Sequence, residues 1–274
     1  MPTFGARRTD ETMDKKFLLD RAAKDAEERI FLAHVLDKYE QSNARNIPAH
    51  MGFLSPAEQR AAGDLLHAAA VHDGFAFLGG YERAERKILC FLPSWQEEAD
   101  DAEFLSALRC AFHDAGALTH RDFLGSLMGL QITRGKIGDI LVGDTSADLI
   151  VSRDIAEYLL QNLTSAGRVK LTVTQVTLSE LAVPELNIKV IRDTVSTLRL
   201  DAVAGAGFSM SRAKAQELIA SGRVQLNHRE TLKSDALVAQ GDIVSARGLG
   251  KFEVAEVGGL SKKGRTGITL HRYL

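Results

Sequence analysis

Positively charged residues beside serine and glycine turns near the C-terminus are the residues best suited to chemistry in this sequence. Arg212 and Lys214 follow two serines, Ser209 and Ser211, either of which could cap the N-terminus of a helix. Positive charges at that end oppose the helix macrodipole, so a purely structural role would favour acids. A bound phosphate reverses this preference, because the cations and the free N–H groups of the first turn then point at the same anion. We therefore expect a phosphate-binding surface at this helix end.

More cations stand on or beside turns in the rest of this C-terminal segment. Glycines accompany them at Gly222, Gly241 and Gly248, and a glycine turn lets a phosphate approach the backbone closely. Each charge alone would be read as solvated surface, whereas the group is better explained by a polyanion. Beyond the helix start, the cations expected to contact this polyanion are Arg223, Arg247, Lys251, Lys262, Lys263 and Arg265.

The elements that must position these cations form two small helices on a little antiparallel sheet. We expect a connector over 184–190, then a short helix over 194–204 that Gly205-Ala206-Gly207 breaks. A second helix follows, with Ala215, Leu218 and Ile219 on one face, and Gly222 suits the left-handed residue after its end. Apolar residues alternate with a polar one at 224–226, as in a strand, and turns are expected at Asn227-His228 and Gly241-Asp242. Further strands are expected at 243–246, 252–257 and 268–273.

This last segment resembles the S4-type RNA-binding domain, which is also found in a small-subunit ribosomal protein, pseudouridine synthases and tyrosyl-tRNA synthetases. The residues that carry the resemblance are Arg199-Leu200-Asp201, Phe208 to Ala215, Leu218-Ile219, Gly222-Arg223-Val224, Asn227, Gly241-Asp242 and Arg247-Gly248. The resemblance implies that the second helix and its flanking turns contact RNA, and that Asp201 caps or pairs within the fold. The contact positions that it implies are Ser211, Arg212, Lys214, Arg223, Asn227 and Arg247.

The middle of the chain alternates strands with two helices, which suggests a compact α+β sandwich of ferredoxin-like or RNA-recognition-motif type. The apolar stretch 104–112 fits either a strand or a helix, and Thr119 is placed to cap the first helix. The other expected elements are strands at 87–92, 137–142, 149–151 and 169–176, and helices at 120–130 and 155–163.

Four basic side chains in this middle part flank four glycines between residues 125 and 138, which suits contact with phosphate. The alternative is that the glycines allow close packing of helix on sheet and that Asp122 pairs with Arg121. A second RNA-contact surface would be formed by His120, Arg121, Arg134 and Lys136.

The middle part also resembles the bacterial YlmH-type S4 proteins, and this resemblance covers the chain from about residue 30 onward. Its motifs are Gly80 to Lys87, Leu118 to Gly125, Lys136 to Ile140 and Lys262 to Arg265. The family is bacterial and plastid-related. Membership would imply a role in ribosome-associated quality control with tRNA-bearing large ribosomal subunits, and a connection to cell division.

The N-terminal part is expected to be helical, with one helix over 10–41 and a second from Ser55-Pro56 to about residue 71. We therefore divide the chain into a helical domain over 1–85, an RNA-recognition-motif-like domain over 86–180 and an S4-type domain over 181–274. The overall class is α+β.

Net charge supports this division. The whole chain of 274 residues carries −2, which by itself argues against a nucleic-acid partner. From Ser196 onward, however, 12 basic and 7 acidic residues give +5, and the rest of the chain is at −7. The basic segment is the one that resembles an RNA-binding domain, and the acidic remainder is expected to offer a surface for a protein partner.

Composition excludes several classes of protein. Two cysteines, Cys90 and Cys110, cannot make a disulfide framework or a thiolate zinc site, and they fit a reducing cytoplasm. The chain has no apolar run long enough to insert in a membrane, and its first 16 residues lack the apolar core of a secretory signal. His67 and His72, like the acid and histidine cluster at 113–122, lack a metal-ligand spacing. We expect no metal and no cofactor.

These observations predict a non-enzymatic, cytoplasmic RNA-binding protein whose S4-type domain docks on structured RNA. The resemblances make ribosomal RNA of the large subunit, with tRNA, the expected target, in quality control or translation. One alternative is an RNA-modifying enzyme, because Arg199-Leu200-Asp201 also resembles the tripeptide around the catalytic aspartate of pseudouridine synthases. A further alternative is an adaptor for cell division that uses the acidic N-terminal part.

Overall fold

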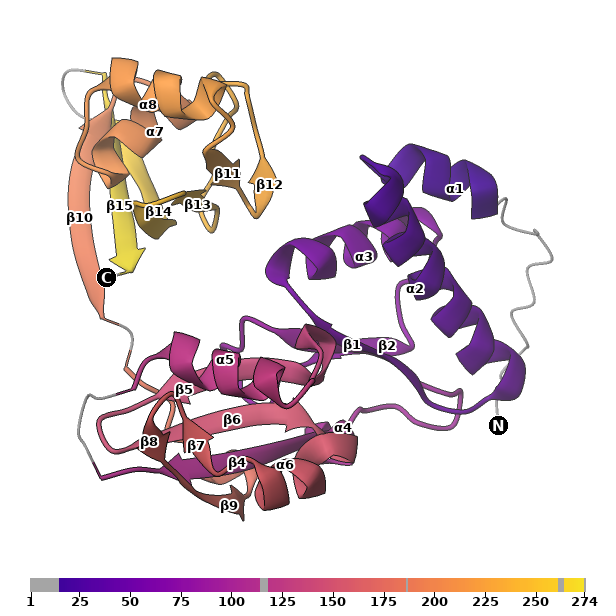
Figure 1. Ribbon diagram of the computed structural model, residues 1–274. Helices are drawn as coiled ribbons and strands as arrows, with labels where there is room; N and C mark the ends of the chain where they lie inside the picture. The colour runs from indigo at the N-terminus through magenta and orange to yellow at the C-terminus, as the bar shows by residue number, and fades with distance from the viewer. Residues whose placement is uncertain (1–14, 114–117, 186, 261–263, 274) are drawn as a thin grey trace, which may run out of the picture. The chain divides into compact units, whose positions relative to one another are not determined.

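The chain forms two compact units, Met1–Val183 and Pro184–Leu274 (Figure 1). The computed structural model describes residues 15–113, 118–185, 187–260 and 264–273. Each unit is treated by itself below. The finer division into three domains, at residues 85 and 180, stays a prediction.

Three helices open the first unit: α1 (Lys15–Ala22), α2 (Ala26–Arg45) and α3 (Pro56–Ala68). The prediction of a single helix over 10–41 is wrong in its described part, because α1 ends at Ala22 and a separate helix, α2, begins at Ala26. The backbone of Asp25 is extended, and its carboxylate caps α2 by accepting a hydrogen bond from the Glu28 N–H at 2.8 Å. The second helix begins where the sequence predicts, with Ser55 and Glu58 forming a capping box.

A three-stranded antiparallel sheet accompanies these helices, in the order β1-β3-β2: β1 (Ala49–Leu54), β2 (Phe75–Leu78) and β3 (Lys87–Phe91). The region 1–85, predicted as a helical domain, thus contains the strands β1 and β2 besides its helices, and β3, which we assigned to the central domain, lies between them. Strands of four to six residues carry little periodicity, and the apolar run of β3 is buried because both faces of its sheet are covered.

The rest of the first unit runs strand, helix, strand, strand, helix, strand. The strands form an antiparallel sheet in the order β5-β6-β4-β9. The ambiguous stretch 104–112 is mainly strand, and the strand predicted over 169–176 is interrupted at Leu171. The principal elements are β4 (Leu105–Ala111), α5 (His120–Gly129), β5 (Ile137–Val142), β6 (Ser146–Ser152), α6 (Ala156–Asn162) and β9 (Thr172–Val176). Short pieces complete it: α4 (Asp101–Phe104), β7 (Ser165–Ala166), β8 (Val169–Lys170), η1 (Arg134–Lys136), η2 (Arg153–Ile155) and η3 (Leu178–Glu180).

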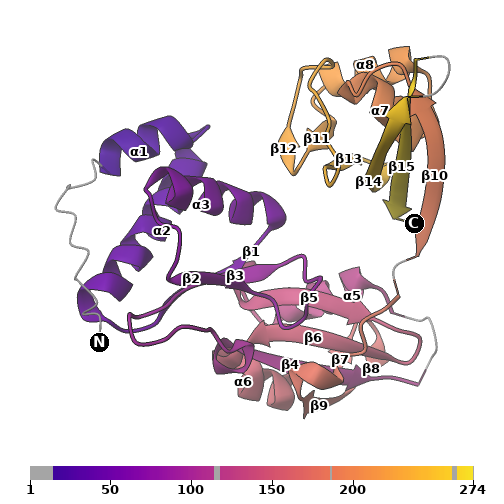
Figure 2. The ribbon, with the colours of Figure 1, turned by 180° about the vertical axis from the view of Figure 1, so that it is seen from behind.

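The two sheets of the first unit stack on each other. On β3, Leu89 packs among α1, α2 and α3, whereas Ile88 and Cys90 point the other way and pack with Ile150 of β6. The neighbouring Leu149 of β6 packs on the far side with α5 and α6. The unit therefore has four layers: helices, the three-stranded sheet, the four-stranded sheet, and helices again (Figures 1 and 2).

The second unit is a six-stranded antiparallel sheet, ordered β10-β15-β14-β13-β11-β12, with α7 and α8 on one face. Its core joins Leu200, Ala204 and Ile219 of the helices to Phe252 and Leu270 of the sheet. The elements are β10 (Ile188–Val195), α7 (Leu200–Gly207), α8 (Arg212–Ala220), β11 (Val224–Leu226), β12 (Arg229–Glu230), β13 (Ile243–Ala246), β14 (Gly250–Leu260) and β15 (Thr266–Tyr273).

The start of this unit differs from the prediction. The last three residues of the segment expected to connect the domains, 188–190, belong to the edge strand β10. The helix α7 begins at Leu200 and includes the three residues expected to break it. The glycines serve packing there. A Cβ on Gly207 would lie 2.2 Å from the ring of Phe252, and one on Gly205 would lie 3.2 Å from the carbonyl oxygen of Met210. Sequence periodicity does not distinguish a glycine that ends a helix from one that lets a helix pack closely.

Candidate nucleic-acid interface

The first turn of α8 holds the cations that the sequence singled out. Ser211, rather than Ser209, is the cap, since its hydroxyl accepts a hydrogen bond from the Lys214 N–H at 3.2 Å. Arg212 and Lys214 are the first and third residues of the helix. The Lys214 side chain is 61% exposed, and its ammonium lies 2.9 Å from Glu217. Two positive charges therefore stand beside the first-turn N–H groups, which have no partner within the helix.

A buried carboxylate anchors Arg212. Asp201 in α7 is fully buried, and its Oδ2 lies 3.1 Å from Arg212 Nε and 3.2 Å from Arg199 Nη2. Gln216 donates a hydrogen bond to the same oxygen at 2.7 Å. Burial alone would raise the pKa of Asp201, but hydrogen bonds from Arg199, Gln216 and Arg212 outweigh it, so the pKa is lowered and the group stays ionised. Asp201 therefore ties the start of α8 to α7.

Two of the turn arginines lie together at one end of the β11–β13 pair. Arg223 Nη2 donates a hydrogen bond to the carbonyl of Arg247 at 3.1 Å, and the Arg247 N–H donates to the carbonyl of Arg223 at 3.0 Å. Both residues are exposed. Each stands next to a glycine with left-handed backbone, Gly222 at φ 70° and Gly248 at φ 84°. The close approach of these two turns concentrates positive charge on an open backbone surface.

Two of the remaining basic candidates of this unit, Lys251 and Arg265, have structural contacts. Lys251 lies over the ring of Tyr273, with its ammonium 5.2 Å from the ring centroid. Arg265 donates from Nε to the Thr194 hydroxyl at 2.9 Å, and from Nη2 to the Thr194 carbonyl. Lys262 and Lys263 fall outside the described residues.

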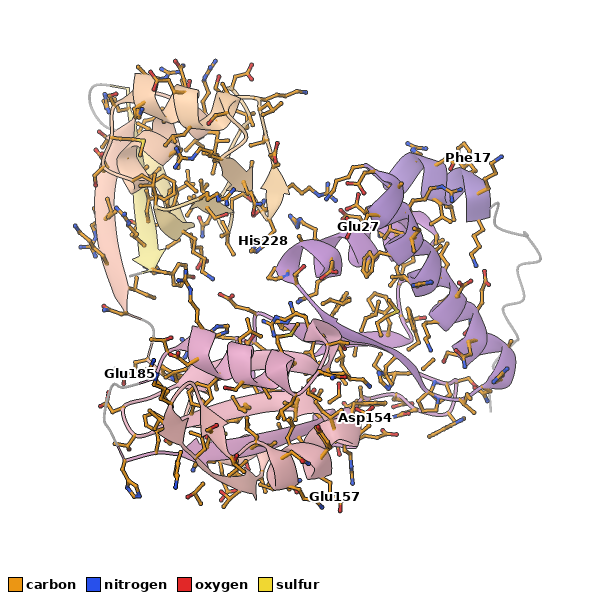
Figure 3. All side chains as sticks on the ribbon, in the orientation of Figure 1. Phe17, Glu27, Asp154, Glu157, Glu185 and His228 are labelled. Atoms are coloured by element: carbon orange, nitrogen blue, oxygen red, sulfur yellow. The ribbon has the colours of Figure 1, made fainter. Side chains whose placement is uncertain are left out.

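Asn227 is occupied by its own turn. Its Nδ2 donates to Asp242 at 2.7 Å, and its Oδ1 accepts from the Ile243 N–H at 2.9 Å. Asn227 and His228 both have left-handed backbone, and they make the predicted turn between β11 and β12 (Figure 3). Both ends of the Asn227 amide thus hold the strand β13 beside this turn.

The four central candidates are not equivalent. Arg121 is exposed at the start of α5. Lys136 lies 2.5 Å from Asp154, which Figure 3 labels. Arg134 is half-buried, and it donates to the carbonyls of Ile137 and Gly138 at 3.0 and 3.3 Å. Desolvation lowers the pKa of Arg134, and proximity to Arg86 lowers it further. Lys136 and Arg134 are therefore engaged in holding the fold.

His120 was expected to contribute a positive charge, but its pKa is lowered. Partial desolvation lowers the pKa of its imidazole, and repulsion by Arg134 adds to this effect. Since an unperturbed histidine is already mostly neutral at pH 7, His120 is a neutral polar group there. The alternative pairing of Asp122 with Arg121 is also not observed, because Asp122 accepts from the N–H and hydroxyl of Thr119 at 2.8 and 2.6 Å.

The motif at residues 80–87 meets the motif at 136–140 through one carboxylate, Asp139. Asp139 accepts hydrogen bonds from the Tyr81 hydroxyl at 2.8 Å, the Glu85 N–H at 2.7 Å and the Arg86 N–H at 3.0 Å. Desolvation, with Asp139 nearby, raises the pKa of Tyr81, so the phenol stays protonated and donates this bond.

The guanidinium of Arg86 completes this junction. It donates to the carbonyls of Ile137, Phe53 and Arg134 at 3.0, 2.7 and 3.2 Å. Because Phe53 belongs to β1 and Ile137 to β5, one side chain joins the two sheets of the first unit.

The stacking of these sheets covers the face that RNA-recognition motifs use. In those domains aromatic side chains on the open sheet face stack with bases. Here the equivalent face carries Ile150, which is fully buried under β1, β2 and β3. On the same face Asp148 is buried and bound by Arg109 at 2.8 and 2.7 Å. This part of the sheet face is therefore not open for bases to stack on.

Neither a metal centre nor a membrane span emerges from the described residues. No group of three or more His, Cys, Asp or Glu side chains among them is placed to hold a metal ion. None of the helices described is both long enough and apolar enough to cross a membrane.

Known proteins are similar to this chain. A protein of Bacillus subtilis (strain 168), named "Ribosome-associated protein quality control protein P2", is 36% identical over 221 residues, which cover 80% of this chain and 85% of that protein. A family model described as "Putative RNA-binding domain in YlmH" matches residues 113–180. The chain belongs to the YlmH family.

A solved structure, "Cell division protein ylmH from Streptococcus pneumoniae", supports the α+β fold of this YlmH-family chain. It aligns with a TM-score of 0.50 and 18% identity, over 59% of this chain and 98% of that chain. At this identity the likeness concerns the fold alone. The matched RNA-binding domain at 113–180 runs from just before α5 to η3.

Sequence reasoning missed the two residues that join the two sheets in the first unit of this YlmH-family chain. Asp139 and Arg86 both lie inside motifs that the sequence singled out, yet nothing in their spacing shows that residues 53 positions apart in the chain meet. Gln216, the third donor to Asp201, was also missed, because a glutamine on a helix face looks like a solvated residue. The signal for Asp201 was present, as an acid in a mostly apolar segment.

Proposed function

We propose that this protein binds structured RNA of the large ribosomal subunit, ribosomal RNA together with tRNA, through an S4-type domain formed by its second unit, and that it acts in ribosome-associated quality control without catalysing a reaction. The observation that carries this proposal is the start of α8. Arg212 and Lys214 stand where the helix dipole disfavours cations, and the buried Asp201 holds Arg212 in place. The Bacillus subtilis relative, whose name refers to ribosome-associated quality control, supports the setting.

Two features of the second unit support the mechanism. A-form RNA hides its base edges in a deep groove, so recognition depends on shape and on phosphate contacts. The helix start and the joined Arg223 and Arg247 turns offer such contacts from a rigid support.

The central part of the first unit has the strand order β5-β6-β4-β9, with its two helices on one face, which is the arrangement of a ferredoxin-like sandwich. The central part would therefore be RNA-recognition-motif-like in fold while its sheet face is covered.

The enzyme alternative requires Asp201 to reach a base. The carboxylate is fully buried, and Arg199, Arg212 and Gln216 all bond to it. This environment suits a structural anchor and gives a nucleophile no access to a substrate, which supports the non-enzymatic proposal. Detection of a pseudouridine in ribosomal RNA that disappears with Asp201→Asn would support the enzyme instead.

The experiment is co-sedimentation with ribosomes across a salt series. We expect the double variant Arg212→Glu with Lys214→Glu to lose most of its binding. Each phosphate contact contributes about 0.7–0.9 to the slope of log K against log salt, so loss of two contacts should reduce the slope by about 1.5. The matched control is Lys16→Glu with Arg21→Glu, which makes the same charge change at exposed positions of α1. Wild-type binding by the α8 double variant would refute the proposal.

The protein-partner prediction has its own test. A pull-down with the full chain, compared with a variant in which the α8 cations are replaced, separates ribosome-dependent partners from partners of the acidic part. Partners from cell division that remain with the variant would favour the adaptor alternative.

A further inference from the structure

A hollow of about 670 Å³ lies in the second unit between β10 and the turn that joins α7 to α8. This volume is within the range of about 300–1,000 Å³ that is typical of small-molecule sites. All of its lining residues belong to one compact unit. Nothing in the helix-start surface described above requires such a depression, because phosphates can be bound on an open surface.

We propose that this hollow takes in one unstacked nucleotide of the bound RNA, with its base on the apolar wall and its phosphate at the basic rim. The inference rests on the proposed function and adds to it a recognised unit, a single extruded nucleotide. Proteins that recognise RNA sequence usually do so at bases that have left the stack.

One wall of the hollow is apolar. It is formed by Ile191 of β10, by Ala202 and Ala206 of α7, and by Met210 of the turn. The flat face of a base can pack on such aliphatic and thioether groups, and burial of a base face is favourable without regard to its identity. The small alanines leave the space that longer side chains would fill.

The rim of the hollow is basic, and its cations are fixed. Arg212 is held by Asp201 at 3.1 Å, and Arg265 is held by Thr194, which itself lines the hollow. Side chains that are already ordered lose less conformational entropy when an anion binds. Arg212 is also the first residue of α8, so the N–H groups of the first helical turn begin at the same rim. One phosphate can therefore bind both to the positive side chains and to backbone N–H donors.

The turn is built to keep this space open. The Met210 N–H donates to the carbonyl of Gly205 at 2.9 Å, and this folds the turn back on α7. Ser209 has left-handed backbone at φ 56°, an uncommon conformation for a residue with a side chain. A Cβ at position 205 would press on the Met210 carbonyl at 3.2 Å. The hollow therefore follows from a tight and specific backbone path.

One acid in the lining, Asp193, indicates which bases fit. Its Oδ1 accepts a hydrogen bond from the Thr194 N–H at 2.6 Å, which orients the carboxylate. A carboxylate accepts hydrogen bonds from exocyclic amino groups, as it does from cytosine N4. We therefore expect adenine, guanine or cytosine to be preferred over uracil, which has no amino group.

The test uses the full chain and two RNA hairpins, one fully paired and one with a single unpaired adenosine, with fluorescence anisotropy as the readout. Burial of the base face against the apolar wall is favourable, so the wild type should bind the hairpin with the unpaired base about tenfold more tightly. Ala206→Leu, which fills the hollow, should remove this preference and leave the affinity for the paired hairpin unchanged. Ala220→Leu makes the same change at an exposed position of α8 outside the lining and should behave as the wild type.

Several outcomes separate the hollow from the proposed function. Equal binding of both hairpins by the wild type, or an unchanged preference in Ala206→Leu, would overturn the inference while ribosome binding stands. Failure of Arg212→Glu with Lys214→Glu to weaken either hairpin would instead refute the proposed function. If Ala206→Leu does not fold, Ala202→Leu fills the same wall. An independent readout is 2-aminopurine at the unpaired position, whose fluorescence should change on binding to the wild type and not on binding to the filled variant.

Discussion

Replacement of Asp201 by asparagine tests the anchor on which the interface depends. The variant keeps the shape of the side chain and removes its charge, so the ion pairs with Arg199 and Arg212 become at best hydrogen bonds from a charged guanidinium to a neutral amide oxygen. Hydrogen bonds to charged groups contribute about 1.5–3 kcal/mol each, and loss of one partner from a buried pair can cost 3–5 kcal/mol. Here the two arginine side chains are 34% and 45% exposed, so water can solvate them when Asp201 is gone. We therefore expect a loss of about 2 kcal/mol.

Native-state hydrogen exchange on the full chain measures this loss in the second unit. The N–H groups of Phe208 and Ala215, bonded to Ala204 and Ser211, report on α7 and α8. A loss of 2 kcal/mol should speed the exchange of their slowest-exchanging amides about 30-fold, because 1.4 kcal/mol corresponds to a factor of ten. The control is Asp235→Asn, the same change at an exposed position of the unit. If both variants exchange at the same rate, Asp201 is not the anchor.

The same variant has a defined pH dependence. Because the pKa of Asp201 is lowered in the folded state, its contribution to stability is present above the unfolded value of about 3.9 and is lost as pH falls through the folded value. The stability difference between wild type and Asp201→Asn should be constant above pH 5 and shrink below pH 4. A difference that instead persists unchanged to pH 2 would show that the ionised carboxylate is not its source.

Three further predictions follow from packing and burial. Gly207→Ala should lower the free energy of unfolding by about 1–3 kcal/mol, because its Cβ would lie 2.2 Å from the fully buried ring of Phe252; an unchanged urea midpoint would contradict this. Gly125→Ala should raise the stability of the first unit by up to about 1 kcal/mol, because a Cβ added at this helical position would meet no described atom beyond its own helix within 4 Å; a lowered melting temperature would show a hidden contact. Cys90 and Cys110 should not react with a thiol reagent in the native protein, since both are buried and burial raises the pKa of each thiol to about 12; rapid labelling before unfolding would show an opening of the core.

The second unit illustrates how much of the interface local sequence signals can predict. A serine cap at position 209 or 211, the left-handed Gly222 and the Asn227-His228 turn were all predicted, because each depends on the conformational preference of one or two residues; the structure selects Ser211. The start of α7 was misplaced by several residues. Its first part, Thr194 and Val195, belongs to the strand β10, whose pairing partner β15 lies about 70 residues later in the chain. No local pattern reports such a distant partner.

The sequence by itself determined which residues carry positive charge, where turns and caps fall, and that a basic segment follows an acidic one, since these properties belong to residues and their neighbours. Only the tertiary structure decided that Asp201 holds Arg212 and that Asp139 and Arg86 join two motifs. It also decided that the face of the central sheet is covered, because β1, β2 and β3 bury their own apolar side chains against it. Burial depends on contacts between residues far apart in the chain, and these contacts select which exposed cations remain for a partner.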